Sequence, residues 1–342
     1  MTDQTPTRTS EPPAEMPAID AVGGPASDPS SMVDVTLPTP SPTGHDLLVE
    51  VDAVSVNPVD VKNRARPRPS DEPRVLGFDA VGRVVAVGEG AHRFAVGDRV
   101  FYAGQVNRPG SDARFQLVNE NIVGPAPRTL SDAEAAAVPL TAITAWEALF
   151  DRLGLAADSE GTLLVIGAAG GVGSLVIQFA KALTRLTVIA VASRPESAEW
   201  VTDMGADHVV GRDFTADVRR IAPHGVDYVF TSFTPGNIDA IAEVIRPRGE
   251  VVSIDETGGS IDALKAKSVT WHWELMFTRP IHEPEDSFQH ELLTRVAGLL
   301  DEGTIRSTLT TRLSPLDAAT LREAHRLVET SQTIGKVVVT RD

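Results

Sequence analysis

The sequence predicts an α/β protein of two units: a mostly antiparallel, barrel-like β domain and a doubly wound parallel-sheet domain. Three observations predict it. Short β-rich runs broken by Gly, Pro and Asp fill residues 19–139, and strand–helix alternation follows from residue 162. A glycine-rich turn joins the first strand of that second part to its first helix. At 342 residues, the chain is long enough for two hydrophobic cores.

The strand–turn–helix–strand unit at residues 162–194 is the strongest of these signals. Thr162–Ile166 and Thr187–Ala192 are apolar and β-rich, as in parallel strands buried on both faces, and Ser174–Leu183 has apolar residues at helical spacing. An isolated glycine motif would be weak evidence, but here a strand precedes it and a helix and a second strand follow. An ordinary strand–helix turn is therefore the weaker interpretation.

The turn itself reads Ala168-Ala169-Gly170-Gly171-Val172-Gly173, a variant of the dinucleotide fingerprint with Ala168 at the first glycine position. Gly170 lets the backbone approach a pyrophosphate, and Gly173 lets the helix pack closely on the strand. We expect Gly170, Gly171 and Val172 to line the pyrophosphate, which the free N–H groups of the helix N-terminus attract.

The end of the second strand indicates which dinucleotide binds. An NAD-binding fold usually has an acidic residue about twenty residues beyond the glycines, against the ribose 2′-OH. Here the chain reads Ser193-Arg194-Pro195, and a hydroxyl followed by a guanidinium suits a 2′-phosphate. The sequence therefore favours NADP(H) over NAD(H), although a solvated arginine at a strand end would look the same.

The remaining elements follow from local patterns. Residues 1–15 are rich in Pro, Thr and Ser and are expected to be disordered, and Met16 is an alternative start to Met1. Ser131–Glu134 is a capping box that opens an alanine-rich helix, and Thr144–Leu153 predicts a second helix. The other expected strands are Leu47–Val56, Ala80–Val87 and Asp98–Tyr102 in the first unit, and His208–Val210, Tyr228–Phe230 and Val251–Ile254 in the second.

Domain boundaries follow from this order of elements. We expect the first domain over residues 16–140 and the dinucleotide-binding domain over residues 141–282. The helical segment Glu291–Leu300 and the β-rich run Gly335–Val339 then return to complete the first domain with residues 283–342.

Composition excludes several classes of function. No apolar run is long enough to cross a bilayer, and the N-terminus lacks the features of a secretory signal, so we expect a cytoplasmic protein without a membrane partner. The absence of cysteine excludes disulfides, thiolate catalysis and cysteine zinc sites. A net charge of −16 opposes nucleic-acid binding. The densest basic stretch, Lys62, Arg64, Arg66 and Arg68, is expected to be a solvated loop.

Further motifs carry a resemblance to a known family. They are Val56–Asp60, Val75–Gly82, Gly88 followed by Phe94–Val100, Leu140–Trp146, and His272–Arg279. Together with the glycine turn, the chain resembles the medium-chain dehydrogenase/reductase superfamily from residue 16 onward. The motifs are similar to its zinc-free quinone oxidoreductase branch, including the subgroup labelled zinc-type alcohol dehydrogenase-like proteins. The resemblance implies a GroES-like catalytic domain, a Rossmann domain and a homodimer, which Ser268–Glu274 could build by extending the parallel sheet.

The resemblance also implies what is missing. Zinc-dependent relatives bind the catalytic metal with cysteines and a Gly-His-Glu segment, but here that segment reads Gly77-Phe78-Asp79 and there is no cysteine. Phenylalanine cannot ligate a metal, and histidines such as His272, His282 and His290 lack metal-ligand spacing. We therefore expect no metal. Without a Lewis acid, alcohol dehydrogenation becomes unfavourable.

The chemistry that remains is hydride transfer from NADPH to a small electrophile that is already electron-poor, a quinone or an α,β-unsaturated carbonyl. Asn57 is the candidate donor to the acceptor oxygen, or else a turn residue before Pro58. Asp60 is expected to buttress this loop. Lys62 stands where familiar quinone reductases have a tyrosine, and either replaces it or is solvated. Tyr102 is a candidate proton donor that could reach the cleft.

The resemblance and the strand ends supply further cofactor-binding candidates. Thr144 resembles the family residue near the nicotinamide, and Phe277 and Lys336 follow from the family layout. Thr231, Ser232, Ile254 and Asp255 lie at or just after the carboxyl ends of the fourth and fifth strands, where doubly wound sheets bind ligands. Trp271 and Trp273 either wall the substrate pocket or pack at an interface.

Two other functions stay open at this point. One is a zinc-independent reductase of ketones or aldehydes on the same scaffold. The other is a non-catalytic, NADPH-binding regulatory protein that kept the fold. Asn57 beside an intact glycine turn favours an enzyme, because a sensor would need only the turn.

Overall fold

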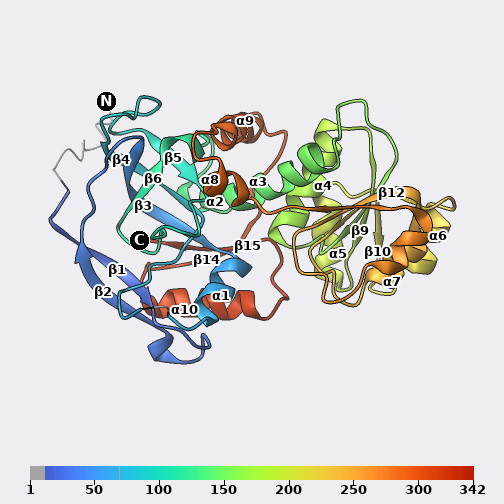
Figure 1. Ribbon diagram of the computed structural model, residues 1–342, viewed down its shortest axis with the longest axis horizontal. Coiled ribbons are helices and arrows are strands. Elements are labelled where there is room, and N and C mark those ends of the chain that lie inside the picture. The colour runs from blue at the N-terminus through green and yellow to red at the C-terminus, as the bar shows by residue number, and fades with distance from the viewer. Residues whose placement is uncertain (1–11, 69) are drawn as a thin grey trace.

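The computed structural model describes residues 12–68 and 70–342, and it divides them between two lobes (Figure 1). One lobe holds a six-stranded parallel sheet in the order β10-β9-β8-β11-β12-β13. Its strands are β8 (Thr162–Ile166), β9 (Thr187–Val191), β10 (His208–Val210), β11 (Val226–Thr231), β12 (Ile245–Ser253) and β13 (Thr270–Trp273). Numbered within the lobe, this is the order 3-2-1-4-5-6 of a doubly wound dinucleotide-binding sheet.

Helices connect these strands in the expected alternation. They are α4 (Gly171–Leu183), α5 (Pro195–Asp203), α6 (Thr215–Ile221) and α7 (Ile238–Val244), with the 3-10 segment η4 (Asp262–Lys267) before β13. The central strands are covered on both faces, since Leu163, Leu164 and Val165 are all fully buried. This is why their sequences are continuously apolar rather than alternating.

The other lobe contains a seven-stranded, largely antiparallel sheet in the order β14-β15-β3-β4-β5-β7, with β6 also paired to β3. Its strands are β3 (Asp46–Val56), β4 (Ala80–Val87), β5 (Arg99–Tyr102), β6 (Phe115–Asn119), β7 (Val123–Pro125), β14 (Leu309–Leu313) and β15 (Lys336–Thr340). A separate ribbon of β1 (Glu15–Ala21) and β2 (Met32–Pro38) lies on its outer side (Figure 1).

The helical segments of this lobe complete the chain. They are α1 (Pro58–Ala65), α2 (Asp132–Ala136), α3 (Pro139–Trp146), α8 (Thr278–His282), α9 (Phe288–Asp301) and α10 (Ala318–Glu329), with the short turns η1 (Pro29–Ser31) and η2 (Glu120–Ile122). Ser131 and Glu134 form the expected capping box before α2. The helix expected over Thr144–Leu153 is instead the end of α3 followed by a π-helix, η3 (Glu147–Arg152).

Two further local expectations need correction. Glu15, expected in the disordered tail, is the first residue of β1, while residues 1–11 lie outside the described part of the chain. The basic stretch expected as a solvated loop begins on α1, and Arg64 there is fully buried. Its guanidinium pairs with Glu329 of α10 and donates to the Gly24 carbonyl, partners that no local pattern reveals.

The C-terminal segment positions the candidate site. β15 inserts between β14 and β3, with Val337 opposite Val56 in the antiparallel β15–β3 register. This pairing brings Lys336 beside the end of β3, where Asn57 and α1 begin. Among the described residues, no helix combines the length and the apolarity that crossing a bilayer requires.

Candidate active site

The glycine turn between β8 and α4 is built by close backbone approach. Gly167 has a left-handed φ of 83°, and a Cβ on Gly173 would lie 2.3 Å from the Gly167 carbonyl oxygen. Gly173 therefore lets α4 pack on the end of β8, as the fingerprint predicts. Ser174 stabilises the turn, because its hydroxyl donates to the Gly170 carbonyl at 2.7 Å.

Gly170 differs from its neighbours because nothing in the protein requires glycine there. Its φ is −75°, and a Cβ would meet only the Gly167 carbonyl oxygen, at 3.5 Å. The space in front of it is open, and α4 begins there without a side-chain cap. Unpaired N–H groups facing an open cradle are what a pyrophosphate needs, so these residues fit a bound dinucleotide.

The C-terminal return closes against this turn from the other lobe. The Gly335 N–H donates to the Ala169 carbonyl at 2.8 Å. A Cβ on Gly171 would lie 2.6 Å from Lys336 Cδ and 3.0 Å from Thr141 Cγ2. Lys336 thus passes directly behind the glycine turn, while α3 contributes Thr141 on the same side.

Beyond the turn, the Lys336 ammonium enters a buried polar cluster. It donates to the Val56 carbonyl at 3.0 Å and to Asn57 Oδ1, and it lies 3.3 Å from Asp79 Oδ2. Asp79 also accepts from Asn57 Nδ2 at 2.8 Å and from the Leu140 N–H at 2.7 Å. Burial lowers the pKa of Lys336 and raises that of Asp79, although each opposes the other's shift by its charge.

Asn57 is fully engaged inside this cluster. Its side chain is 1% exposed, and its Nδ2 donates to both the Ser55 carbonyl (3.2 Å) and Asp79. With Oδ1 bound by Lys336, no amide hydrogen is free for an acceptor molecule. This arrangement favours the turn-residue interpretation over direct donation to a substrate oxygen.

Asp60 takes the buttressing position that we expected. Its Oδ2 accepts the Asn57 N–H at 2.7 Å, which fixes the first turn of α1. Burial raises the pKa of Asp60 to about 7, against the opposing effects of that hydrogen bond and the Lys336 charge. Asp112 is buried nearby, and burial together with the Asp60 charge raises its pKa well above the usual range.

The residues present do not fit the zinc centre that related dehydrogenases carry. Phe78 stands at the histidine position, and its ring packs edge-on against Phe277 at 5.5 Å between centroids. The Asp79 carboxylate is occupied by Lys336, Asn57 and the Leu140 N–H. With no cysteine in the chain, no ligand set remains at this position.

Tyr102 is not where we expected it. Its side chain is 1% exposed and packs in the core of the β-barrel lobe among residues such as Val54, Ala80 and Val123. Burial raises the pKa of its hydroxyl above the usual value. The expected role as a proton donor in the cleft is therefore wrong, because the β5 register with β4 turns this side chain inward.

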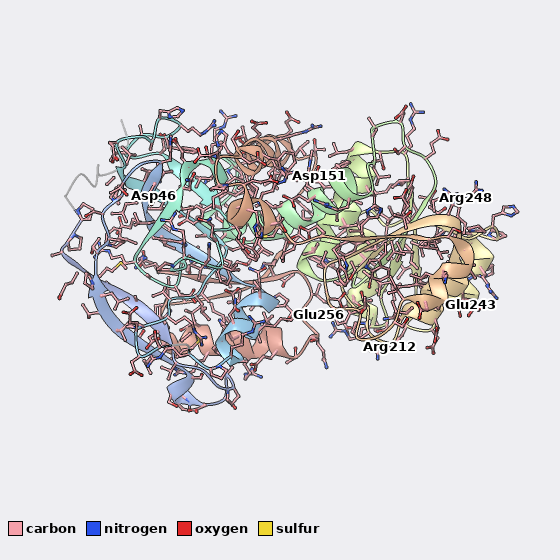
Figure 2. All side chains as sticks on the ribbon, in the orientation of Figure 1. Asp46, Asp151, Arg212, Glu243, Arg248 and Glu256 are labelled. Carbon is pink, nitrogen blue, oxygen red and sulfur yellow. The ribbon has the colours of Figure 1, made fainter. Side chains whose placement is uncertain are left out.

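Lys62 and Arg194 lie on the surface and each reaches the other lobe. Lys62 on α1 pairs with Glu256, just after β12, at 3.2 Å, and Glu256 lies at the boundary between the lobes (Figure 2). The Arg194 guanidinium donates to the Gln332 carbonyl at 2.6 Å, and Ser193 beside it is exposed. Both cations retain hydrogen-bond donors that a ligand could use.

The predicted residues at the strand ends gather at the carboxyl edge of the parallel sheet. Thr231 is buried, and the Ser232 N–H donates to the Ile166 carbonyl at 3.2 Å, directly against Gly167. Asp255 is held by the Thr234 N–H at 2.9 Å and by the Thr234 and Ser253 hydroxyls. Ile254 is half-buried beside them. Asp255 therefore orders this edge rather than presenting a free carboxylate.

Two other cofactor candidates lie on helices or turns next to the site. Thr144 is buried on α3, one turn beyond Thr141, which faces Gly171. Phe277 is buried and leads into α8.

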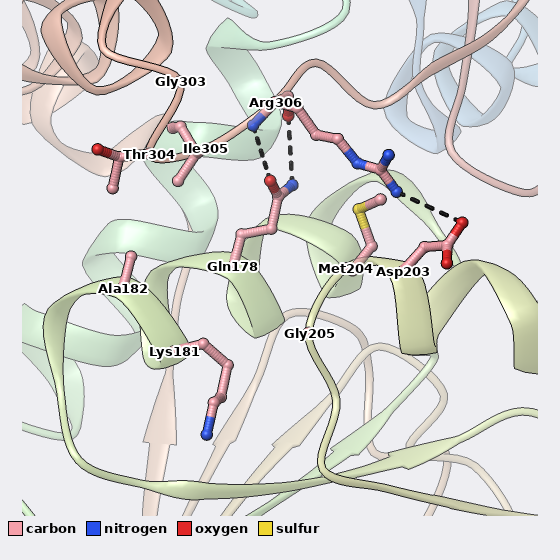
Figure 3. Close-up of a pocket in the computed structure, with 10 residues that line it drawn as sticks. All are labelled: Gln178, Lys181, Ala182, Asp203, Met204, Gly205, Gly303, Thr304, Ile305 and Arg306. Carbon is pink, nitrogen blue, oxygen red and sulfur yellow. Dashed lines mark hydrogen bonds and ion pairs between the residues drawn. The ribbon is translucent and has the colours of Figure 1, made fainter.

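The pocket shown in Figure 3 lies elsewhere, between α4, α5 and residues 303–306, and none of its lining residues belongs to the predicted site. The Gln178 amide crosses this pocket: its Nε2 donates to the Arg306 carbonyl, and its Oε1 accepts the Arg306 N–H.

The structure also shows residues that sequence reasoning missed. Asp79 is the centre of the buried cluster, and its pairing with a lysine 257 residues later has no local signature. Phe233 is exposed beside Gly167. His45, His92 and Glu120 form a further group, with ligand atoms within 4.8 Å of one another. The spacing of these residues along the chain gives no sign of it.

Comparisons with known proteins agree with this geometry. Residues 43–128 match the alcohol dehydrogenase GroES-like domain, and residues 204–339 match the zinc-binding dehydrogenase family. A zinc-type alcohol dehydrogenase-like protein of Staphylococcus epidermidis is 40% identical over 310 residues, which cover 88% of this chain and 92% of that protein.

Two further relatives extend the comparison. A presumed zinc-dependent alcohol dehydrogenase from Rhizobium etli CFN 42 superposes with a TM-score of 0.91 at 48% identity, covering 95% of this chain and 98% of that one. The chloroplastic NADPH-dependent alkenal/one oxidoreductase of Arabidopsis thaliana is 30% identical, covering 86% of this chain and 71% of that protein. The chain thus belongs to the medium-chain dehydrogenase/reductase superfamily and is one of its NAD(P)H-dependent oxidoreductases.

Proposed function

We propose that this protein transfers a hydride from NADPH to a quinone or an α,β-unsaturated carbonyl without using zinc. The observation that carries the proposal concerns the position where relatives bind the catalytic metal. There the Asp79 carboxylate is already bound by Lys336 and the Leu140 N–H, and its neighbour is Phe78, which cannot ligate a metal. Without a Lewis acid to polarise a plain carbonyl or alcohol, the acceptor itself must delocalise the arriving charge. Quinones and enones do this through conjugation.

The chain's own residues would hold the dinucleotide in three places. Gly170 and the N-terminus of α4 would receive the pyrophosphate, while Ser193 and Arg194 would bind the 2′-phosphate. Ser232 and Ile254, at the carboxyl edge of the sheet, would lie along the nicotinamide half, near Thr144. When bound, the nicotinamide supplies the hydride.

The buried cluster would keep the surrounding backbone rigid. Lys336 joins Asn57 at the start of α1 to the back of the glycine turn, so the two lobes share one polar anchor. Hydride transfer depends on orientation, so it requires the segment at Asn57 to be fixed relative to the glycine turn that would hold the cofactor. Support for an enone acceptor comes from the Arabidopsis relative, whose name specifies NADPH and alkenal/one substrates.

The test is a panel of acceptors with NADPH, followed by the loss of nicotinamide absorbance. We expect turnover with 1,4-benzoquinone or an alkenone, and little with the matching saturated ketone and aldehyde. Equal turnover of the saturated carbonyls would instead support a zinc-independent carbonyl reductase. NADPH binding without turnover of any acceptor would contradict an enzyme and support a regulatory protein.

Gly170→Val offers a control for the cofactor site. The backbone at Gly170 has an ordinary φ of −75° and a Cβ there makes only a normal contact with the Gly167 carbonyl oxygen, so we expect the variant to fold. A side chain there would occupy the phosphate cradle, and we expect at least a tenfold loss of NADPH affinity. Unchanged affinity in folded Gly170→Val would contradict the placement of the pyrophosphate.

A further inference from the structure

A second cluster of ligand atoms lies in the β-barrel lobe, away from the site described above. His45 Nδ1 is 2.9 Å and His92 Nδ1 is 3.3 Å from the same oxygen, Glu120 Oε1. Within the described parts of the chain, this is the only group of three or more such side chains close enough to share a metal ion. Two imidazoles and a carboxylate form a ligand set typical of divalent transition metals.

The backbone brings these side chains together from three segments. His45 precedes β3, His92 follows β4, and Glu120 begins η2. The Gly90 N–H donates to the Gly44 carbonyl at 2.8 Å, and the Glu120 N–H donates to the His45 carbonyl at 2.9 Å. A Cβ on Gly88 would lie 2.4 Å from the Gly44 oxygen, so glycine is what allows the two histidine-bearing segments to meet.

Glu120 is already fixed as a ligand would need to be. Its side chain is fully buried, and its Oε2 accepts the N–H groups of His92 and Arg93 at 2.9 and 2.7 Å. These bonds fix the plane of the carboxylate, so Oε1 faces the two imidazole rings.

The surroundings also favour a cation. His45 and His92 are 42% and 71% exposed, so an ion can enter from solvent. The nearby Arg93 guanidinium is turned toward Asn121 Oδ1, at 3.2 Å. The competing contact is His92 Nδ1 with the Gly90 carbonyl at 3.1 Å, which a metal would have to replace.

We propose that His45 Nδ1, His92 Nδ1 and Glu120 Oε1 bind one divalent transition-metal ion, with Zn²⁺ as the best fit. Bonds of about 2.0–2.1 Å in a tetrahedron place neighbouring ligand atoms roughly 3.3 Å apart, close to the separations found here. Water would complete the coordination.

This site would be structural rather than catalytic. β3 runs 11 residues between His45 and Asn57. At about 3.3 Å per residue, a strand of this length spans at most roughly 35 Å, so the two sites lie at opposite ends of β3. The ion would tie together the turn before β3, the segment after β4 and η2, and would stabilise the folded chain in proportion to its binding affinity.

The experiment uses the full-length protein stripped of metal and titrated with ZnCl₂ by calorimetry, with Tm measured in parallel. We expect one Zn²⁺ per chain with a micromolar or lower Kd, and a higher Tm when Zn²⁺ is present. His45→Gln and His92→Gln should each weaken binding at least tenfold. Both side chains are partly or largely exposed, so these variants should fold. His208→Gln, at an exposed histidine on β10, is the matched control.

Two results would overturn the proposal. One is a Zn²⁺ affinity that His45→Gln and His92→Gln leave unchanged, which would place the ion elsewhere. The other is an absence of saturable one-to-one binding up to 100-fold molar excess, which would leave His45–Glu120 as a hydrogen bond alone. Turnover with NADPH is measured on the same samples, and loss of activity on metal removal would contradict the structural role.

Discussion

Lys336 Nζ lies 3.3 Å from Asp79 Oδ2, and neither side chain is exposed by more than 4%. Asp79 precedes β4, whereas Lys336 opens β15, the strand that returns from the far end of the chain. All three ammonium hydrogens have acceptors, at Val56, Asn57 and Asp79. This pair therefore joins the N-terminal and C-terminal parts of the β-barrel lobe immediately behind the glycine turn.

Replacing Lys336 should lower the stability of the folded protein. In Lys336→Met, Asp79 loses its counter-charge inside the protein, and breaking a buried ion pair in this way typically costs about 3–5 kcal/mol. We expect a loss of that size in the free energy of unfolding, measured by urea denaturation. Lys181→Met is the control, because Lys181 pairs with Asp207 at a partly exposed site and should cost at most about 1 kcal/mol.

A double variant separates charge from packing. Lys336→Met with Asp79→Leu removes both buried charges, and we expect it to recover part of the stability that Lys336→Met loses. A loss below 1 kcal/mol in the single variant would show that the pair contributes little to stability.

Asn57→Ala tests whether Asn57 is structural or donates to the acceptor. The variant leaves Asp79 and Lys336 each short of one hydrogen bond, so we expect about 1–3 kcal/mol less stability. Turnover of the folded fraction should fall by less than tenfold, since no amide hydrogen faces the acceptor. Asn63→Ala, on the same helix α1, controls for helix effects.

The opposite result has a clear signature. If Asn57 does donate to the acceptor oxygen, turnover should fall about a hundred- to a thousandfold with NADPH affinity nearly intact. That outcome, with an unchanged Tm, would restore Asn57 as a catalytic residue.

Arg194→Ala should weaken NADPH binding more than NADH binding. The guanidinium lies just after β9 with one Nη bound to the Gln332 carbonyl, which leaves other N–H groups for the 2′-phosphate that we propose. Losing a charge-assisted hydrogen bond should cost roughly 1.5–3 kcal/mol, about ten- to a hundredfold in affinity. Fluorescence titration of both cofactors gives the dissociation constants.

Arg185→Ala provides the comparison, because Arg185 pairs with Glu160 on the surface after α4. Equal binding of NADH and NADPH by the wild-type protein would refute the preference for NADP(H), whatever the variants do.

The edge strand β13 leads us to expect a homodimer. β13 ends the parallel sheet, and Trp271 and Trp273 stack edge-on there at 5.9 Å between centroids, with Trp273 54% exposed. An uncovered apolar edge favours pairing with another strand, and a second copy across a two-fold axis supplies one. Light scattering at micromolar concentration should give twice the chain mass, and Trp273→Glu should give the monomer. Val96→Glu, at another exposed apolar residue, should leave the mass unchanged, while a monomeric wild-type protein would contradict the dimer.

Local pattern explains most of the fold and only part of the site. β8 and β4 begin and end where the sequence predicts, because alternation, apolar runs and the glycine turn are local signals. The side chains of Arg64 and Tyr102 are buried rather than exposed or in the cleft, because strand register and chain return decide their surroundings. Sequence alone identified Lys336 through family layout, but not the carboxylate that it faces.

Acid should destabilise the protein through His325. This residue on α10 is fully buried, and neither ring nitrogen has a hydrogen-bond partner within the described structure. Burial, helped by the Arg64 charge, lowers its pKa to about 3. In the unfolded chain an imidazole titrates near pH 6.5. Between that pH and about 3, the unfolded state therefore binds a proton that the folded state does not bind.

Stability from this group is therefore intact above about pH 6.5 and falls as the pH drops toward 3. The linkage amounts to about 2 kcal/mol by pH 5. His325→Leu removes the titrating group and two unpaired ring nitrogens, so the variant should lose about 2 kcal/mol less than the wild type between pH 7 and pH 5. Urea denaturation at both pH values measures the difference, with His208→Leu as the exposed control. If wild type and His325→Leu lose the same stability over this range, the imidazole is protonated in the folded state and its surroundings are not as the structure places them.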